Sequence, residues 1–401
     1  MTQEDYQQLE ALYLAKVKKV DTRFVRYLYG QINWDVRLIG IKGARGVGKT
    51  TMLLQRIKMA YKKTDAVFYV SLDNLWFQSH TLPELVDWLY LQGVRHLFID
   101  EVHKYPNWTT VVKNLYDTYD DLNIVYTGSS MLEIDNARVD LSRRQSLYTM
   151  QGLSFREYLA LNKIKEVTPM TVLQLFEEHQ HLAMEVCRDI PVTRHFADYL
   201  KRGYYPFSLE SGSDYLMRLR ETVSLVIETD MPAVESVSYA TIQKTKLLLM
   251  VIAENVPLVP NVSKLSLRLE ATRDSCLKML YTLDKSGLLL LFTHEVKSYK
   301  HLVAPEKIYL GNTNLMYALG SSIDNGTLRE TFFLNQLSLH HNVTAPIQGD
   351  FLVDSKYLFE VGGKNKTFEQ IKDIKDSFLA VDGIEVGSRN RIPLWMFGLL
   401  Y

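Results

Sequence analysis

The segment Gly43-Ala44-Arg45-Gly46-Val47-Gly48-Lys49-Thr50 decides the fold class, because it matches the pattern G-x-x-x-x-G-K-[ST] at every position. Such a loop joins a strand to a helix and points several backbone N–H groups at the phosphates of a nucleotide. Its flanks agree, since residues 36–41 have strand character and residues 52–57 have helical character. We therefore predict a phosphate-binding loop rather than a chance match in a glycine-rich turn.

The residue types at the end of the loop predict ATP and Mg²⁺ as ligands. Lys49 would lie against the β- and γ-phosphates, and the Thr50 hydroxyl would ligate Mg²⁺, with Thr51 the less favoured ligand. No Asn-Lys-x-Asp segment that reads a guanine base follows, so we expect ATP rather than GTP. The expected nucleotide-binding residues are Gly43, Ala44, Arg45, Gly46, Val47, Gly48, Lys49, Thr50 and Thr51.

The composition is that of an ordinary globular chain of two or three domains: 401 residues, of which 47% are hydrophobic and 23% charged. Its 46 basic and 46 acidic residues cancel, so no global charge favours a polyanion or an anionic membrane. The apolar runs are too short to span a bilayer, and no signal peptide is recognisable. Only Cys187 and Cys276 are present, which supports neither a disulfide framework nor a zinc site. We expect a cytoplasmic protein without a membrane partner.

Alternating strand-like and helical runs predict an α/β domain over residues 1–160, with a parallel sheet covered by helices. The expected strands are Val36–Ile41, Ala66–Leu72, Arg95–Ile99, Asn123–Tyr126 and Ser146–Met150.

Two carboxylates follow the third expected strand, as in a Walker B motif. Asp100 would hold the hydrated Mg²⁺, and Glu101 would orient or deprotonate the attacking water. If no phosphate-binding loop lay upstream, the alternative would be that the two carboxylates are simply a solvated acidic strand end. We expect His103 to pack rather than to catalyse.

The fourth expected strand ends in small hydroxyl residues. We expect this strand to lie between the loop strand and the Asp100 strand, so that its end can reach the γ-phosphate or the lytic water. Ser129 or Thr127 would make this contact, and a simple Gly-Ser turn is the alternative.

Arg143 and Arg144 precede the fifth expected strand. Either guanidinium could neutralise charge on the transferring phosphoryl group, in the same chain or in a neighbouring subunit of a homo-oligomer. The alternative is a pair of surface arginines.

The remaining chain predicts a helical connector at residues 161–238, a winged helix-turn-helix at 239–320 and a small α/β unit at 321–401. The winged helix is predicted from three expected helices at 247–254, 262–269 and 272–286, which two expected strands follow at 288–292 and 307–310. DNA is therefore an expected partner, and a protein-contacting basic face is the alternative. The basic residues concerned are Arg268, Arg273, Lys278, Lys285, Lys297 and Lys300.

Four segments, GARGVGKTT, HLFIDEVHKYPNW, IVYTGSS and LSRRQSLYTMQGLSFREYL, carry a family resemblance in their order and spacing. The chain resembles prokaryotic AAA+-type P-loop ATPases that pair an ATPase domain with a C-terminal domain of uncharacterised function. The resemblance implies an AAA+-like core, a winged helix and a terminal domain with a restriction-endonuclease-like fold.

The terminal unit contains acidic and basic residues in the order of an endonuclease site: Glu330, Asp350, Glu360 and Lys364. Their spacing departs from the motif, because three residues rather than one separate Glu360 from Lys364, and we expect the strand to break at Gly362 and Gly363. We expect helices at 328–340 and 367–376, strands at 349–353 and 357–361, and Asp354 in a turn.

The leading hypothesis is thus an Mg²⁺-dependent ATPase whose nucleotide state repositions its C-terminal domains. Two alternatives remain: a nucleotide-gated DNA-binding or signalling module with slow turnover, and an ATP-coupled nuclease.

Overall fold

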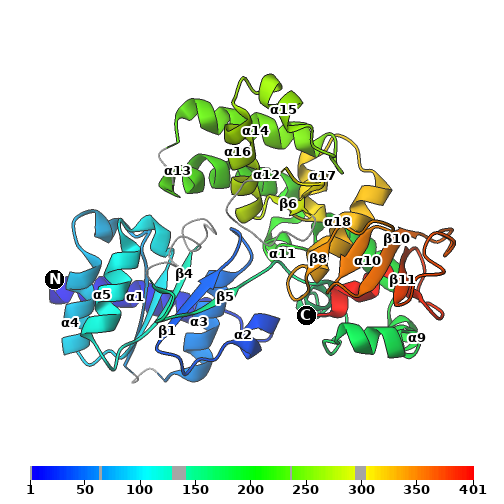
Figure 1. The fold of residues 1–401 in the computed structure, drawn as a ribbon. Coiled ribbons are helices and arrows are strands. Elements are labelled where there is room, and N and C mark those ends of the chain that lie inside the picture. Colours follow the sequence, from blue (N-terminus) through cyan, green and yellow to red (C-terminus); the bar gives the residue numbers. More distant parts are fainter. Residues whose placement is uncertain (1, 63–65, 129–140, 235–236, 294–303) are drawn as a thin grey trace. The chain divides into compact units, whose positions relative to one another are not determined.

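A five-stranded sheet carries the phosphate-binding loop in the computed structural model, which describes residues 2–62, 66–128, 141–234, 237–293 and 304–401. Its strand order is β2-β3-β4-β1-β5, and every pairing is parallel (Figure 1). The strands are β1 (Leu38–Lys42), β2 (Val67–Ser71), β3 (His96–Asp100), β4 (Asn123–Gly128) and β5 (Ser146–Thr149). All five predicted strands are confirmed, and β4 lies between β1 and β3 as expected.

The sheet and its helices form the first of two units, which comprises Met1–Gln151 and Thr229–Ser236. β1 is buried along its whole length, as expected for a central parallel strand covered on both faces. α1 packs against α3 and β2. The helices of this unit are α1 (Gln3–Lys19), α2 (Tyr27–Gln31), α3 (Lys49–Ala60), η1 (Leu75–Gln78), α4 (Leu82–Leu91), η2 (Val102–Lys104), α5 (Trp108–Thr118) and α13 (Met231–Val234).

The second unit comprises Gly152–Glu228 and Val237–Tyr401. Its first boundary lies close to the predicted boundary at residue 160, and the predicted subdivision into 161–238, 239–320 and 321–401 stays a prediction. Its first helices are α8 (Phe155–Leu161), α9 (Val172–Asp189), α10 (Val192–Arg202), α11 (Ser208–Ser211), η3 (Gly212–Asp214) and α12 (Tyr215–Leu225). A π-helical turn, η4 (Val226–Asp230), crosses the boundary between the units. The later helices are α14 (Tyr239–Ala253), α15 (Val262–Arg268), α16 (Arg273–Lys285), α17 (Thr313–Leu319), α18 (Asn325–Leu337) and η5 (Leu394–Leu399).

A buried asparagine holds three helices of the second unit together. Asn314 in α17 accepts hydrogen bonds at Oδ1 from the Tyr204 backbone N–H (2.9 Å) and the Tyr215 hydroxyl (2.5 Å). Its Nδ2 donates to the carbonyl oxygens of Tyr199 (3.1 Å) and Leu200 (2.9 Å) in α10. Since every polar atom of the amide is paired, this fully buried side chain stabilises α10, α12 and α17 as one body.

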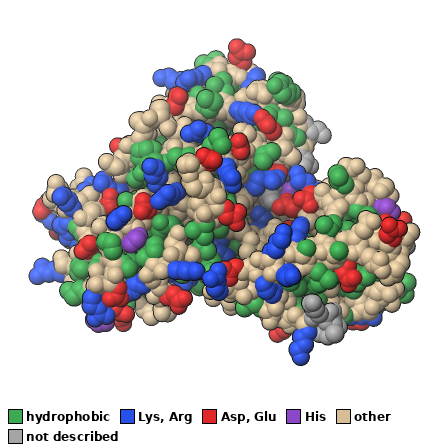
Figure 2. Space-filling view, turned by 180° about the vertical axis from the view of Figure 1, so that it is seen from behind, with side chains coloured by type: hydrophobic (Ala, Val, Ile, Leu, Met, Phe, Trp, Pro, Cys, Tyr) green, Lys and Arg blue, Asp and Glu red, His purple; other side chains and the backbone are tan. Residues whose placement is uncertain are grey.

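Helices and a strand pair occur where the winged helix is predicted. α14, α15 and α16 precede an antiparallel pair, β6 (Leu289–Phe292) and β7 (Lys307–Leu310). Arg268, Arg273, Lys278 and Lys285 are exposed, whereas Lys297 and Lys300 lie outside the described residues. Basic and acidic side chains are interspersed over the face shown in Figure 2, as expected for a formal net charge of zero. The winged-helix assignment and DNA contact stay predictions.

The terminal sheet contains more strands than predicted, in the order β12-β11-β10-β9-β8. The pairs β10·β11 and β11·β12 are parallel, and the others are antiparallel. Asp354 follows β9 with a φ of 52°, which confirms its place in a turn. The strands are β8 (Val343–Thr344), β9 (Phe351–Val353), β10 (Tyr357–Gly363), β11 (Ser377–Asp382) and β12 (Arg391–Pro393).

The predicted helix at 367–376 is wrong, since this segment forms successive turns. Its apolar residues Phe368, Ile371 and Ile374 recur at every third position, a spacing that three-residue turns share with a helix. The Ile371 N–H donates to the Phe368 carbonyl (3.2 Å) and the Ile374 N–H to the Ile371 carbonyl (3.1 Å). Ile371 is fully buried against Leu358 and Leu379, so packing under the parallel strands determines the conformation.

The close approach of two backbones at Gly43 predicts a stability effect. A Cβ atom on Gly43 would lie 2.2 Å from the Met150 carbonyl oxygen, whereas one on Gly30 in α2 would meet nothing within 4 Å. We expect Gly43→Ala to lower the free energy of unfolding by about 1–3 kcal/mol, because the backbone after β5 must shift. The control Gly30→Ala should change it by less than about 1 kcal/mol, in the stabilising direction. Urea unfolding of the two variants measures the difference, and equal values would contradict the clash.

Candidate nucleotide-binding site

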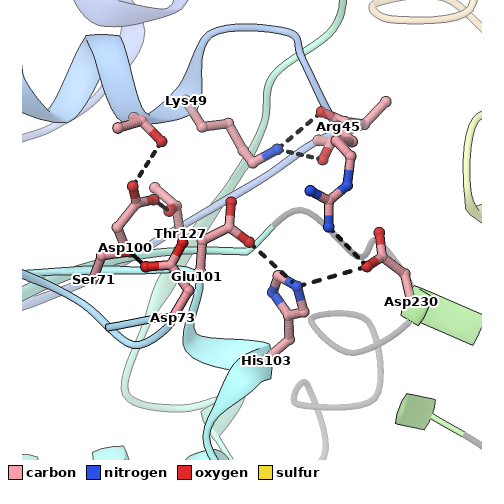
Figure 3. Close-up of polar contacts among 12 residues, drawn as sticks. Arg45, Lys49, Ser71, Asp73, Asp100, Glu101, His103, Thr127 and Asp230 are labelled. Atoms are coloured by element: carbon pink, nitrogen blue, oxygen red, sulfur yellow. Dashed lines mark hydrogen bonds and ion pairs between the residues drawn. The ribbon is translucent and has the colours of Figure 1, made fainter. Parts of the chain in front are cut away.

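The phosphate-binding loop lies between β1 and α3, as its sequence predicts. Gly48 precedes α3 with a φ of 101°, a left-handed conformation that favours glycine. Lys49 begins the helix, and its side chain turns back into the loop (Figure 3). Its Nζ donates to the carbonyl oxygens of Gly43 (2.8 Å) and Ala44 (2.9 Å). A buried cation therefore lies within the curve of the loop, where phosphate oxygens would offer it stronger, charged acceptors.

Burial disfavours the charged form of the Lys49 ammonium, whose side chain is only 4% exposed. Desolvation lowers the pKa of Lys49 to about 8, although the carboxylates of Glu101 and Asp100 raise it. Arg45 contributes a smaller lowering effect. Because a buried ammonium needs anionic partners, this environment suits a polyphosphate.

Asp100 is the point on which three other elements converge. Thr127 Oγ1 donates to its Oδ1 (Figure 3). Thr50 Oγ1 (2.6 Å) and the Tyr69 hydroxyl (2.9 Å) donate to its Oδ2. The carboxylate is 2% exposed. α3, β2 and β4 thus each contribute a hydroxyl group to the carboxylate at the end of β3, which places Thr50 and Asp100 together as predicted.

The donor set around Asp100 fits Mg²⁺ in the form that nucleotides carry. One carboxylate and one hydroxyl oxygen suffice for this ion, since phosphates and waters complete its coordination. Among the described residues, no group of three or more His, Cys, Asp or Glu side chains could hold a metal ion by protein ligands alone. Asp100 and Thr50 would therefore hold the ion together with the nucleotide. Thr51 is exposed, which agrees with its lower rank as a ligand.

Glu101 has an unusual backbone conformation beside this site. Its φ of 56° lies in the left-handed region, which non-glycine residues rarely adopt and which often marks functional sites. Its carboxylate is partly exposed, and Oε2 lies 3.2 Å from His103 Nε2. Glu101 thus lies next to Asp100 at the end of β3, with a partly exposed carboxylate beside the imidazole of His103.

His103 is buried, as expected for a packing residue, but it contacts charged groups that the sequence did not predict. Its Nε2 lies 4.0 Å from Oδ1 of Asp230, whose carboxylate accepts a hydrogen bond from Arg45 Nη2 at 3.1 Å (Figure 3). Desolvation lowers the pKa of His103 to about 4, and the attraction of Asp230 offsets this only in part. The cations Lys104, Lys49 and Arg45 lower the pKa further.

Two residues of this site, Asp230 and Tyr69, were not identified from the sequence. Asp230 lies in the segment interpreted as a connector, 185 positions after Arg45, and no motif marks it. Tyr69 lies within β2, where an aromatic residue in a buried strand is ordinarily part of the core. Its burial raises the pKa of Tyr69, as does the neighbouring Asp100 charge, which keeps the hydroxyl a hydrogen-bond donor.

Two of the predicted residues, Arg143 and Arg144, do not join this cluster. Ser129 lies outside the described residues, so of the two hydroxyl candidates only Thr127 is placed. Arg144 donates from Nε to Asp117 Oδ1 at 2.8 Å, and Arg143 is exposed. Asp117 lies near the end of α5, before β4 begins, and both arginines precede β5. They therefore lie at the amino ends of the strands, opposite the loop, so an action on the same chain's nucleotide is not supported. Action on a neighbouring subunit stays a prediction.

The endonuclease-like residues pair differently from the prediction. Glu360 is 2% exposed and pairs with Lys366 Nζ at 2.7 Å, whereas Lys364 is exposed. The expected break at Gly362 and Gly363 is wrong, because β10 continues through both glycines in parallel pairing with β11.

The acidic residues of this region are engaged with neighbouring groups. The Tyr309 hydroxyl donates to Glu330 Oε2 (2.5 Å), and the Val361 backbone N–H donates to Asp350 Oδ2 (2.8 Å). The described residues here form no metal-binding group of three acidic or imidazole side chains. The nuclease alternative stays a prediction.

Residues 35–159 match the family model described as an AAA domain. The strand order and the loop geometry agree with this match and define a P-loop α/β fold for the first unit. No helix in the described ranges is long and apolar enough to cross a membrane.

Two proteins of Methanocaldococcus jannaschii are similar in sequence. Uncharacterized protein MJ1637 is 27% identical over 88% of this chain and 81% of its own length. Uncharacterized protein MJ1544 is 29% identical over 38% of this chain and 34% of its own length.

Solved structures of replication initiators are more distant. DnaA bound to AMPPCP and single-stranded DNA has 11% identity and a TM-score of 0.30, covering 69% of this chain and 87% of its own. AMPPCP-bound DnaA from Aquifex aeolicus has 14% identity and a TM-score of 0.27, covering 69% of this chain and 88% of its own. At these TM-scores neither structure carries a conclusion about this protein.

The low pKa of His103 predicts how stability depends on pH. The unfolded chain takes up a proton at this histidine near pH 6.5, whereas the folded protein does so only near pH 4, so stability falls as the pH drops between these values. Between pH 7.5 and 5.0 the contribution lost is at most about 2 kcal/mol. We expect the free energy of unfolding of His103→Gln, measured in urea, to decline less over this range than that of the wild type. Parallel declines would show that His103 is not responsible.

Proposed function

We propose that this protein binds ATP with Mg²⁺ and hydrolyses it, and that the nucleotide state changes the conformation of its C-terminal segments. The observation that carries the proposal is the contact between Thr50 and Asp100, beside the buried ammonium of Lys49. These are the side chains that the loop chemistry needs for Mg²⁺ and for the β- and γ-phosphates. The match of residues 35–159 to an AAA domain supports the same conclusion.

The proposed roles follow from charge and position. The loop amides and Lys49 would bind the β- and γ-phosphates and counter the charge that develops between them. Mg²⁺, when bound, supplies further charge neutralisation, and Thr50 with Asp100 would hold it. Glu101 would orient the attacking water and accept its proton, and Thr127 would hold Asp100 in place.

Slow turnover remains the main alternative within the same site. A protein that binds ATP tightly and hydrolyses it slowly would use the nucleotide as a signal, and the exposed arginines and lysines of α15 and α16 would then suit contact with nucleic acid phosphates.

Removing the Lys49 ammonium should abolish tight nucleotide binding. We expect Lys49→Ala to weaken ATP binding about tenfold to a hundredfold, since a buried charge-assisted contact to phosphate is lost. The matched control is Lys58→Ala, which removes an exposed lysine from the same helix and should leave affinity unchanged. Titration of a fluorescent ATP analogue gives both constants. Full affinity and turnover in Lys49→Ala would refute the assignment.

Replacing Glu101 should separate binding from hydrolysis. We expect Glu101→Gln to bind ATP as the wild type does while its turnover falls about 10²–10⁴-fold, the usual contribution of a positioned base. Release of phosphate under single-turnover conditions measures the rate. An unchanged low rate in both proteins would instead favour the slow-turnover module.

A further inference from the structure

Residues 229–236 form a short excursion of the chain into the first unit. Both flanking segments, which end at Glu228 and resume at Val237, belong to the second unit. η4 ends at Asp230, and α13 begins at the next residue. Asp230 is thus covalently connected on both sides to segments of the second unit. A displacement of Asp230 would therefore also displace the backbone that leads into those segments.

Asp230 is buried and pairs mainly with Arg45, while His103 Nε2 lies 4.0 Å from its Oδ1. Its side chain is 2% exposed, and Oδ1 accepts the hydrogen bond from Arg45 Nη2 (3.1 Å). Its other oxygen, Oδ2, is buried and has no hydrogen-bond partner among the described residues. A buried carboxylate is costly unless it is paired and hydrogen-bonded, so loss of Arg45 would strongly destabilise this position.

Arg45 belongs to the phosphate-binding loop, between Gly43 and Gly46. Its Nε is also buried without a hydrogen-bond partner in the described part of the chain. A guanidinium has five donors in a planar fork and pairs well with phosphate oxygens. The charges of Arg45 and Asp230 both act on Lys49, the residue proposed to lie against the γ-phosphate. The ion pair thus lies close to the proposed position of that phosphate.

We propose that Asp230 is a positioning residue that competes with the γ-phosphate of ATP for Arg45, and so couples the nucleotide state to the chain of the second unit. This inference rests on the proposed ATP binding. The γ-phosphate attracts Arg45 and repels the buried carboxylate, whereas ADP lacks that charge. The conformation of residues 229–234 therefore differs between the ATP and ADP states. Because coupling is reciprocal, the Asp230 carboxylate lowers the affinity for ATP relative to ADP.

Binding constants for a non-hydrolysable ATP analogue and for ADP, measured on the full chain, test the coupling. Asp230→Asn removes the charge with little change of shape, so we expect the preference for the ATP analogue over ADP to rise about fivefold to tenfold. Asp230→Glu keeps the charge and should keep a preference near that of the wild type. The control Glu228→Gln should also do so, because Glu228 pairs with Lys246 within the second unit.

Hydrogen–deuterium exchange gives a readout that is independent of affinity and turnover. In the wild type, peptides covering residues 226–237 should exchange differently with the ATP analogue than with ADP. In Asp230→Asn this difference should disappear, and in Asp230→Glu and Glu228→Gln it should remain. If Asp230→Asn does not fold, Asp230→Ser serves instead, since it also removes the carboxylate charge and leaves the loop residues unchanged. It too should lose the difference in exchange.

The coupling is overturned if the variant that folds keeps the wild-type difference in exchange, or if Asp230→Asn has an unchanged or weakened preference for the ATP analogue. Failure of the proposed function looks different. If the wild type binds neither nucleotide, both ideas fall. If the wild type binds and hydrolyses ATP while Asp230→Asn is indistinguishable from it, only the coupling falls.

Discussion

The carboxylate of Asp100 is the group on which the geometry of the first unit depends. It terminates β3 and accepts hydrogen bonds from hydroxyl groups of α3, β2 and β4. A buried, ionised carboxylate is tolerated only with such partners, so the strand ends must meet at this point. The parallel order β2-β3-β4-β1-β5 brings β4 between the loop strand and β3, which makes the contact with Thr127 possible. The same interaction that organises the sheet edge places Thr50 and Asp100 where Mg²⁺ would be held.

The site contains basic and acidic side chains that largely neutralise one another, which most strand ends of a parallel sheet do not. Lys49 and Arg45 lie in or beside the loop, and Asp100, Glu101 and Asp230 lie opposite them (Figure 3). All five side chains are largely buried, so the cost of removing each charge from water must be offset by its attraction to the opposite charges nearby. Introducing a triphosphate must redistribute these pairings, since its oxygens are stronger acceptors than the carbonyl groups that now accept from Lys49. A site of this kind suits a protein whose conformation responds to its nucleotide.

Local patterns predicted the first unit well and the last part of the chain less well. Four strands of the first unit, β1 to β4, are apolar runs of five or six mostly buried residues, and such runs identify buried parallel strands from local sequence. β11 was missed because it follows a segment whose three-residue periodicity resembles that of a helix, and β12 was missed because it has only three residues. The lysine that pairs with Glu360 is Lys366 rather than Lys364, because β10 continues through its glycines before the chain turns. A strand end depends on the partner strand, which local sequence does not describe.

The sequence by itself determined the phosphate-binding loop, the five-stranded parallel sheet and the roles expected for Lys49, Thr50 and Asp100. Each of these rests on neighbouring residues in a single segment, where backbone geometry and side-chain chemistry are local. Only the tertiary structure decided that Tyr69 donates to Asp100, that Arg144 pairs with Asp117, and that Asp230 pairs with Arg45. These contacts join residues from separate elements, up to 185 positions apart, and distance along the chain carries no information about which side chains folding brings together.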